Sequence, residues 1–172
     1  MPRNTDGTYY NVSLRYQDWD YSDDGAYFLT ICTLRRQKFF GYIKNGEIRL
    51  SDIGEIVQNE WLKTKIIRPE LNLYLEDFVI MPDHFHGIII IRRRCARPGA
   101  STGPFSSEPG TKKGPQYNNI PSIVRGFKSA VTIQARKINP GFAWQRRYYD
   151  RVIRHWDEYC MIRDYIRANP NK

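Results

Sequence analysis

The sequence predicts an α+β fold in which helices pack on one face of an antiparallel sheet. Apolar stretches of strand length recur along the chain, and two of them are separated only by a tight turn at Asn45-Gly46. The helical stretches alternate with this hairpin-built sheet rather than with repeated parallel crossovers. Because 172 residues suit one compact unit, we expect a single domain over residues 1–172.

The N-terminal part of the chain is expected to form an irregular arm, a strand and a hairpin. Residues 1–25 are polar and aromatic by turns, which is typical of an arm without regular structure. Residues 26–34 are mostly apolar, β-branched or aromatic, as in a buried strand. The hairpin joins residues 39–43 to residues 47–50 through Asn45-Gly46, the kind of pair that tight hairpin turns prefer.

A helix and two strands are expected next. Ser51 or Asp52 can cap a helix over residues 52–65, in which apolar side chains recur at helical spacing. Leucines alternate with polar residues over residues 71–75, and residues 78–81 are all apolar. A short Pro-Asp turn then leads into residues 84–92. The short turn makes these two strands antiparallel neighbours.

The C-terminal half is expected to hold a loop, two helices and one more strand. Residues 93–119 are rich in Gly, Pro, Ser and Lys, which indicates a long, flexible basic loop. An amphipathic basic helix follows from Pro121 until Asn139-Pro140-Gly141 stops it, then an extended segment over residues 143–154 and a helix over residues 156–168. The resulting order fits a ferredoxin-like, or RRM-like, antiparallel sheet.

Charge favours a polyanionic partner. The chain has 27 Lys plus Arg against 18 Asp plus Glu, a formal charge of +9 and an isoelectric point near 9.6. Nucleic acid is the first candidate, although a solvated basic face on an ordinary enzyme has the same composition. The charge alone leaves both interpretations open.

The cysteine pattern and the absence of long apolar runs indicate a cytoplasmic protein. Cys32, Cys95 and Cys160 are odd in number and contain no CxxC pair, which argues against a disulfide framework and a zinc cage. The N-terminus lacks an apolar signal core, and no apolar run reaches the roughly 18 residues that span a bilayer. We therefore expect no membrane partner.

A His-x-His pair and a distant helix carry the candidate chemistry. His84 and His86 share one face of the predicted strand because side chains alternate along it, and two neutral imidazoles can share a divalent cation. Tyr165 and Asn169 lie at i and i+4, on one row of the last helix. Two half-buried histidines with local hydrogen bonds, and a core tyrosine with an asparagine near a helix end, are the structural alternatives.

Five ordered segments carry a resemblance to a known family. They are YFLTICT at 27–33, IMPDHFHGII at 80–89, GFKSAV at 126–131, WQRRYYDRVIR at 144–154 and YIRANP at 165–170. With these segments the chain resembles the single-tyrosine HUH transposases, and among them the REP-associated tyrosine transposases. The resemblance spans most of the chain and implies a ferredoxin-like core.

The resemblance also implies a site and a reaction. It implies His84, His86 and Asn169 as ligands of Mg²⁺ or Mn²⁺, and Tyr165 as the nucleophile that cuts single-stranded DNA at hairpins such as REP-like elements. The expected products are a 5′-phosphotyrosine and a free 3′-hydroxyl. The REP-associated branch implies a monomer, and a homodimer is the alternative that related transposases suggest.

Other tyrosines and acids compete for roles in this site. Tyr149 ranks a distant second as nucleophile, and Tyr159 lies six residues before Tyr165, on the opposite side of the helix. Asp83 and Asp150 are candidate outer-shell partners of the metal, with turn and strand-end roles as the alternative.

Basic residues interleaved with aromatic residues are expected to grip single-stranded DNA, with cations for phosphates and rings for base stacking. The candidate DNA-binding residues are Arg92, Arg93, Arg94, Arg125, Lys128, Arg146, Arg147, Arg151 and Arg154. Two other functions remain open at this stage. One is a non-catalytic, RRM-like module that binds single-stranded nucleic acid, and the other is a metal-dependent phosphodiesterase that uses water as its nucleophile.

Overall fold

The computed structural model describes residues 24–75, 77–92 and 118–169. Most of the predicted N-terminal arm, and residues 93–117 of the predicted basic loop, therefore lie outside the described residues. The helices and strands are, in chain order, β1 (Gly25–Cys32), η1 (Leu34–Arg36), β2 (Gly41–Lys44), β3 (Glu47–Leu50), α1 (Asp52–Ile66), η2 (Pro69–Leu71), β4 (Leu73–Tyr74), β5 (Phe78–Met81), β6 (His84–Ile91), α2 (Ile120–Ile138), β7 (Tyr149–Ile153) and α3 (Trp156–Ala168).

The main sheet is antiparallel and centred on β1 and β6. Its strands follow the order β4-β6-β1-β7, and β5 also pairs with β6. Strand β1 aligns residue by residue with β6, from Gly25 opposite Ile91 to Cys32 opposite His84. The hairpin of β2 and β3 forms a separate two-stranded sheet. The predicted α+β class with an antiparallel sheet is confirmed, while its finer ferredoxin-like assignment stays a prediction.

Local sequence signals set the helix ends as expected. The Ser51 side chain accepts a hydrogen bond from the Gly54 amide and caps α1. Asn119 and Ser122 form a reciprocal capping box at the start of α2, with Pro121 in its first turn. The predicted extended segment before α3 is shorter as a strand, because only Tyr149–Ile153 pairs with β1 and Trp144 forms an isolated bridge with Thr33.

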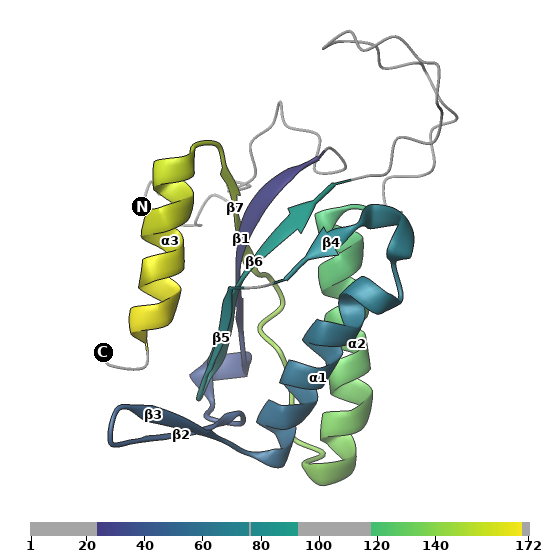
Figure 1. Ribbon diagram of the computed structural model, residues 1–172. Coiled ribbons are helices and arrows are strands. Elements are labelled where there is room, and N and C mark those ends of the chain that lie inside the picture. Colours follow the sequence, from purple (N-terminus) through teal and green to yellow (C-terminus); the bar gives the residue numbers. More distant parts are fainter. Residues whose placement is uncertain (1–23, 76, 93–117, 170–172) are drawn as a thin grey trace, which may run out of the picture.

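One face of the main sheet carries α1 and α2 and the larger core (Figure 1). Aromatic rings interlock there: the Trp61 ring centroid lies 4.6 Å from that of Phe85 and 5.5 Å from that of Phe127. All three side chains are buried. Because apolar burial is the dominant favourable term in folding, this face supplies most of the stability.

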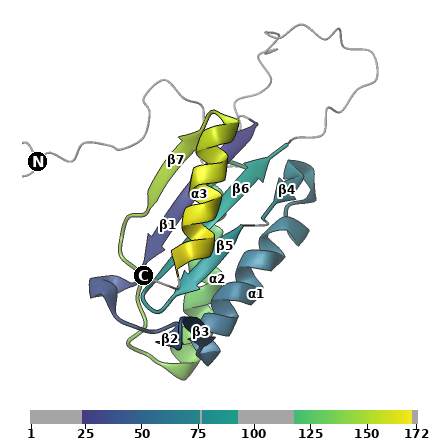
Figure 2. The ribbon, with the colours of Figure 1, turned by 60° about the vertical axis from the view of Figure 1, so that its left-hand side comes forward.

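The last helix, α3, lies on the opposite face of the sheet (Figure 2). It covers a smaller cluster in which Phe28, Ile88, Ile153 and Ile166 are buried. The prediction that helices pack on one face only is therefore wrong. The physical reason is that β1 and β6 carry large apolar side chains at consecutive positions, so both of their faces require cover. No helix among the described residues is long and apolar enough to cross a membrane.

Candidate active site

The two histidines of β6 project from the face of the sheet that α3 covers. Side chains alternate along the strand, so Phe85 between them points into the larger core on the other face. The His84 and His86 rings lie side by side, with centroids 4.6 Å apart and planes at 82°. The period of two thus brings both imidazoles together, as the sequence predicts.

Each imidazole is anchored through its Nδ1 atom. Nδ1 of His86 lies 2.8 Å from Oγ1 of Thr30, the residue opposite it on β1. Nδ1 of His84 lies 2.5 Å from Oδ1 of Asp83, whose other oxygen pairs with Nε of Arg36 at 2.9 Å. Such contacts fix the ring orientation and direct the Nε2 atoms toward a ligand. Of the two predicted outer-shell candidates, Asp83 contacts a histidine and Asp150 does not lie on this face. Asp150 is opposite Leu29 in the sheet and points to the other side.

Both imidazoles are neutral near pH 7. Burial, aided by the neighbouring His84 and Arg36, lowers the pKa of His86 from 6.5 to about 4. Burial also lowers the pKa of His84, against the opposing effect of Asp83. A neutral imidazole keeps a lone pair for a metal, so the electrostatics of the site favour ligation over charge pairing.

Tyr165 reaches this pair from α3. Its phenol oxygen lies 3.4 Å from Nε2 of His86, and the two ring centroids are 5.4 Å apart. The ring also meets the edge of Phe28, at a centroid distance of 6.4 Å. The side chain nevertheless stays 41% exposed. The phenol is thus held beside the imidazoles and remains accessible to a substrate.

Asn169 ends α3, one turn beyond Tyr165. The side chain is only 6% exposed, and its Nδ2 atom has no hydrogen-bond partner among the described residues. A buried amide N–H without a partner is costly, so Nδ2 would favour an acceptor oxygen, whereas Oδ1 is the atom of this amide that could ligate a cation. No cluster of three His, Cys, Asp or Glu that could hold a metal occurs in the described ranges. Two imidazoles and one carboxamide oxygen form a donor set that fits a divalent cation.

A buried carboxylate fixes the position of α3. Asp77, beside β5, accepts a hydrogen bond from the Tyr159 phenol at 2.7 Å and one from Nη2 of Arg167 at 3.0 Å. Tyr159 and Arg167 flank Tyr165 along the helix, so one carboxylate holds the helix on both sides of the phenol. Sequence reasoning missed Asp77, because only the packed helix brings it near residues 82 and 90 positions away.

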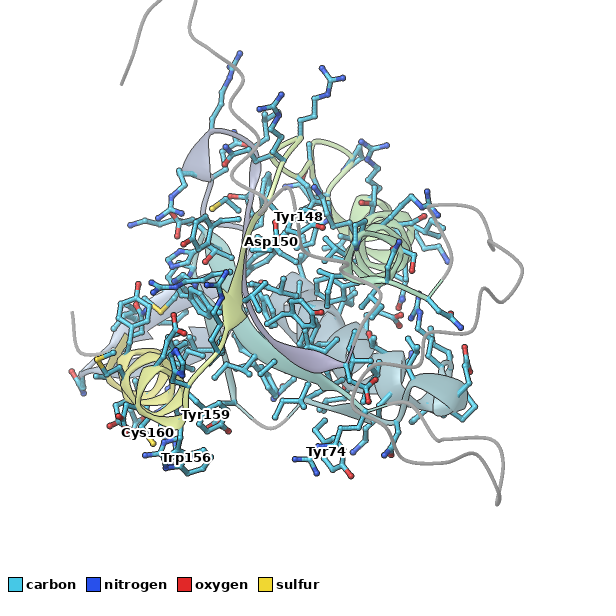
Figure 3. All side chains as sticks on the ribbon, turned by 90° about the horizontal axis from the view of Figure 1, so that it is seen from above. Tyr74, Tyr148, Asp150, Trp156, Tyr159 and Cys160 are labelled. Carbon is cyan, nitrogen blue, oxygen red and sulfur yellow. The ribbon has the colours of Figure 1, made fainter. Side chains whose placement is uncertain are left out.

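The competing tyrosines lie in different places. Tyr149 on β7 is opposite Thr30, 39% exposed, and on the same face of the sheet as Tyr165. Tyr148 packs against the larger core on the other side. Figure 3 shows Tyr159 beside Trp156 and Cys160 on α3, apart from Tyr148 and Asp150. Tyr149 is therefore a second phenol, among the described residues, on the sheet face that carries the histidines.

The predicted basic residues do not gather on one surface. Arg151 lies on the α3 side of the sheet, where its Nη2 pairs with Glu158 at 2.6 Å. Arg146, Arg147 and Arg154 are exposed on either side of β7. Arg92 is exposed at the end of β6, with its guanidinium 5.5 Å from the centre of the Tyr74 ring. Arg93 and Arg94 lie outside the described residues.

Two further predicted basic residues, Arg125 and Lys128, lie on α2, across the sheet from Tyr165. The ammonium of Lys128 donates to the backbone oxygen of Gln145 at 2.7 Å, and lies 6.0 Å from the centre of the Trp144 ring. Burial lowers the pKa of Lys128. This residue therefore ties α2 to the segment before β7.

Both faces of the main sheet carry helices, which bears on the RRM-like alternative. An RRM stacks bases on aromatic side chains of an open sheet. Here Phe28, on the second face, is 8% exposed beneath α3. The described part of the sheet therefore offers little open platform for stacking.

The chain is similar to known proteins in sequence and in fold. No protein-family model matches the chain. A protein from Haemophilus influenzae that bears the name "Uncharacterized protein" is 36% identical over an alignment of 169 residues, and the match covers 95% of this chain and 90% of that protein. This chain belongs to the same family.

A solved structure shares the fold of this chain. It is the structure of the REP-associated tyrosine transposase bound to a REP hairpin, with a TM-score of 0.60 and 20% sequence identity. The match covers 92% of this chain and 73% of the transposase chain. This chain therefore has the fold of that transposase. The resemblance to REP-associated tyrosine transposases that the sequence motifs indicate is confirmed at the level of the fold.

Proposed function

We propose that this protein is a metal-dependent endonuclease and strand transferase of the single-tyrosine HUH type, which cuts single-stranded DNA at hairpins. The observation that carries the proposal is the contact between the Tyr165 phenol and Nε2 of His86, 3.4 Å apart. The Tyr165 phenol of α3 meets the two neutral imidazoles of β6 there, and Asn169, one helical turn beyond Tyr165, would supply its carboxamide. The shared fold with a transposase bound to a REP hairpin supports a hairpin substrate.

Tyr165 would act as the nucleophile. A phenol with a pKa near 10 attacks weakly, so its placement against the phosphodiester matters most. As the bond from phosphorus to the phenol oxygen forms, the bond to the 3′ oxygen breaks, the phenol loses its proton and the 3′ oxygen gains one. The products are a 5′-phosphotyrosine and a free 3′-hydroxyl, which can reverse the step and join strands.

His84, His86 and Asn169 would hold Mg²⁺ or Mn²⁺. When bound, the cation would neutralise charge on the phosphodiester and favour its cleavage. The anchored Nδ1 atoms keep both imidazoles in position before any ligand arrives, and the neutral state of both rings leaves their Nε2 lone pairs available.

We further propose that one chain forms a complete site and acts as a monomer within a single domain. The phenol of α3 lies beside the histidines of the same chain. A dimer with shared sites would instead need the tyrosine of one subunit to reach the histidines of another. Arg151 within β7, with Arg146 and Arg147 before the strand and Arg154 after it, would contact the DNA strand near Tyr165.

Covalent labelling tests the nucleophile. We expect wild-type protein with Mn²⁺ and a hairpin oligonucleotide labelled at its 3′ end to form a protein–DNA adduct that survives denaturing electrophoresis. The same oligonucleotide labelled at its 5′ end should give a short free fragment. Tyr165→Phe should lose the adduct, by at least about a thousandfold in rate. Tyr149→Phe, which removes a half-exposed phenol from the same sheet face, serves as the matched control and should keep it.

Two outcomes would contradict the proposal. An adduct that persists in Tyr165→Phe and disappears in Tyr149→Phe would move the nucleophile to β7. Cleavage without any adduct would indicate water as the nucleophile, whereas binding that EDTA does not affect and no cleavage of any hairpin would leave a non-catalytic binding protein.

A further inference from the structure

A polar cavity lies between the segment that follows α1 and the first half of α2, on the opposite side of the sheet from Tyr165. It has a volume of about 590 Å³, and it opens where the end of α1 meets the first half of α2. Figure 1 shows these two helix ends side by side. Its polar lining includes Arg68, Glu70, Ser122, Arg125 and Ser129. The proposed nuclease reaction uses none of Arg68, Ser122 or Ser129.

Arg68 is the unusual member of this lining. Its Nη1 atom is buried and has no hydrogen-bond partner in the described part of the chain. No described carboxylate forms an ion pair with it, although Glu70 is close enough to favour its charged form. Burial lowers the pKa of the guanidinium, which nonetheless stays charged at neutral pH. Arg68 is half-buried, and a buried N–H of a guanidinium without an acceptor is costly, so an anionic ligand would satisfy it.

The chain makes room for this guanidinium on α2. A Cβ atom at Gly126 would lie only 2.6 Å from Nη2 of Arg68, so the guanidinium crosses the helix where the side chain is missing. Ser122, Gly126 and Ser129 lie at i, i+4 and i+7, on one polar stripe of α2. Ser129 therefore lies on one side of the guanidinium position, and Ser122, whose hydroxyl donates to the Asn119 carbonyl in the capping box, lies on the other. The neighbouring stripe of α2 packs into the larger core and holds the polar stripe in place.

We propose that this cavity binds a phosphate group, held by the guanidinium of Arg68 and the hydroxyl of Ser129, with Ser122 lining the wall beside them. Guanidinium groups bind phosphate through paired, charge-assisted hydrogen bonds, and hydroxyls complete such sites. Arg125, on the same stripe, adds positive charge to the cavity. The phosphate comes either from the backbone of a DNA strand or from a small phosphate compound. Only the first source rests on the proposed function.

Titration with inorganic phosphate tests the cavity without any DNA. We expect addition of phosphate to the full chain, in EDTA, to shift the amide resonances of Ser122, Gly126 and Ser129. In Arg68→Gln the shifts should vanish. Gly126→Ala provides an independent variant, because its added methyl group displaces the flexible end of Arg68 while alanine favours the helix. It should also lose the shifts and keep its fold.

Hairpin affinity then distinguishes the two sources of phosphate. In the Tyr165→Phe chain with EDTA, which excludes cleavage, Arg68→Gln and Gly126→Ala should weaken hairpin binding about five- to tenfold. The slope of log K against log salt should fall by about one for Arg68→Gln. Lys65→Gln removes the same charge from an exposed position near the end of α1, outside the cavity, and should leave both quantities unchanged.

The outcomes separate this inference from the nuclease proposal. Phosphate-induced shifts with unchanged hairpin affinity would support the phosphate site and exclude DNA as its source. Amides that phosphate does not shift, together with variants that bind DNA like the parent chain, would overturn the inference. If the wild-type protein formed no covalent adduct with DNA, the nuclease proposal would fail, but the phosphate titration would remain valid because it needs neither cleavage nor metal.

Discussion

The two faces of the main sheet differ in what they contain. The face under α1 and α2 holds the larger core, in which Trp61, Phe85 and Phe127 interlock. The face under α3 holds four buried apolar residues beside the histidine pair. One sheet thus places most of its apolar burial on one side and the histidine pair with the Tyr165 phenol on the other. The comparison teaches that stability and chemistry can be varied separately in this fold.

The largest effect on stability is expected on the α1 and α2 face. Phe127→Ala removes a buried ring that contacts Trp61, Phe85 and Trp144, and should lower the free energy of unfolding by about 3–5 kcal/mol. Urea denaturation measures it. Ile133→Ala, on the exposed side of the same helix, should change it by less than about 0.5 kcal/mol. Equal losses in the two variants would refute the assignment of the core to this face.

A pH-dependent loss of similar size is expected on the α3 face. The folded-state pKa of His86, about 4, lies below the unfolded value of 6.5, so the unfolded chain binds more protons between these values. The stability present above pH 6.5 is therefore lost as the pH falls toward 4, by up to about 3 kcal/mol. Urea denaturation in EDTA at several pH values measures this loss.

The matched variant for this pH dependence is His86→Gln, which does not titrate in the same range. Its free energy of unfolding should fall less than that of the wild type between pH 6.5 and pH 4. Parallel pH profiles for the two proteins would show that His86 does not cause the pH dependence of the free energy of unfolding.

The smallest effect on stability, but a specific one, is expected at the attachment of α3. Asp77→Asn removes the charge that Arg167 pairs with and weakens the contact with Tyr159, at a cost of about 1–2 kcal/mol. Amide exchange in α3 should accelerate while exchange in α2 stays unchanged. Because α3 positions Tyr165, adduct formation should slow more than the loss in stability alone explains.

Arg167→Gln is the control for Asp77→Asn. It removes the same ion pair from its exposed end, where such pairs contribute less than about 1 kcal/mol, and it leaves the Tyr159 contact in place. Its effect on α3 exchange should be smaller. If Asp77→Asn accelerates exchange equally in α2 and α3, the carboxylate acts on global stability rather than on the position of the helix.

Short-range patterns explain which features could be predicted. The alternation of side chains in β6 places His84 and His86 on one face, and helical spacing places Tyr165 and Asn169 on one row. Asn45-Gly46 and Ser51 mark the hairpin and the start of α1 because their preferences depend on neighbouring residues only. The assignment of the chain to α+β follows from the same local signals.

Long-range contacts explain what could not be predicted. The position of α3 on the second face depends on which apolar positions of β1 and β6 remain uncovered after α1 and α2 have packed. The role of Asp77 depends on a helix some 80 to 90 residues later, and that of Arg68 on a missing side chain at Gly126. None of these partners is marked by spacing along the chain.

By itself, the amino-acid sequence determined the elements, their caps and turns, and which side chains share a face of each strand or helix. Only the tertiary structure decided that β6 and α3 bring an imidazole and a phenol to within 3.4 Å, and that the buried Nη1 atom of Arg68 has no hydrogen-bond partner among the described residues. The physical reason is range. Backbone preferences act over a few residues, whereas the packing of α1 and α2 on one face of the sheet and of α3 on the other depends on the whole core.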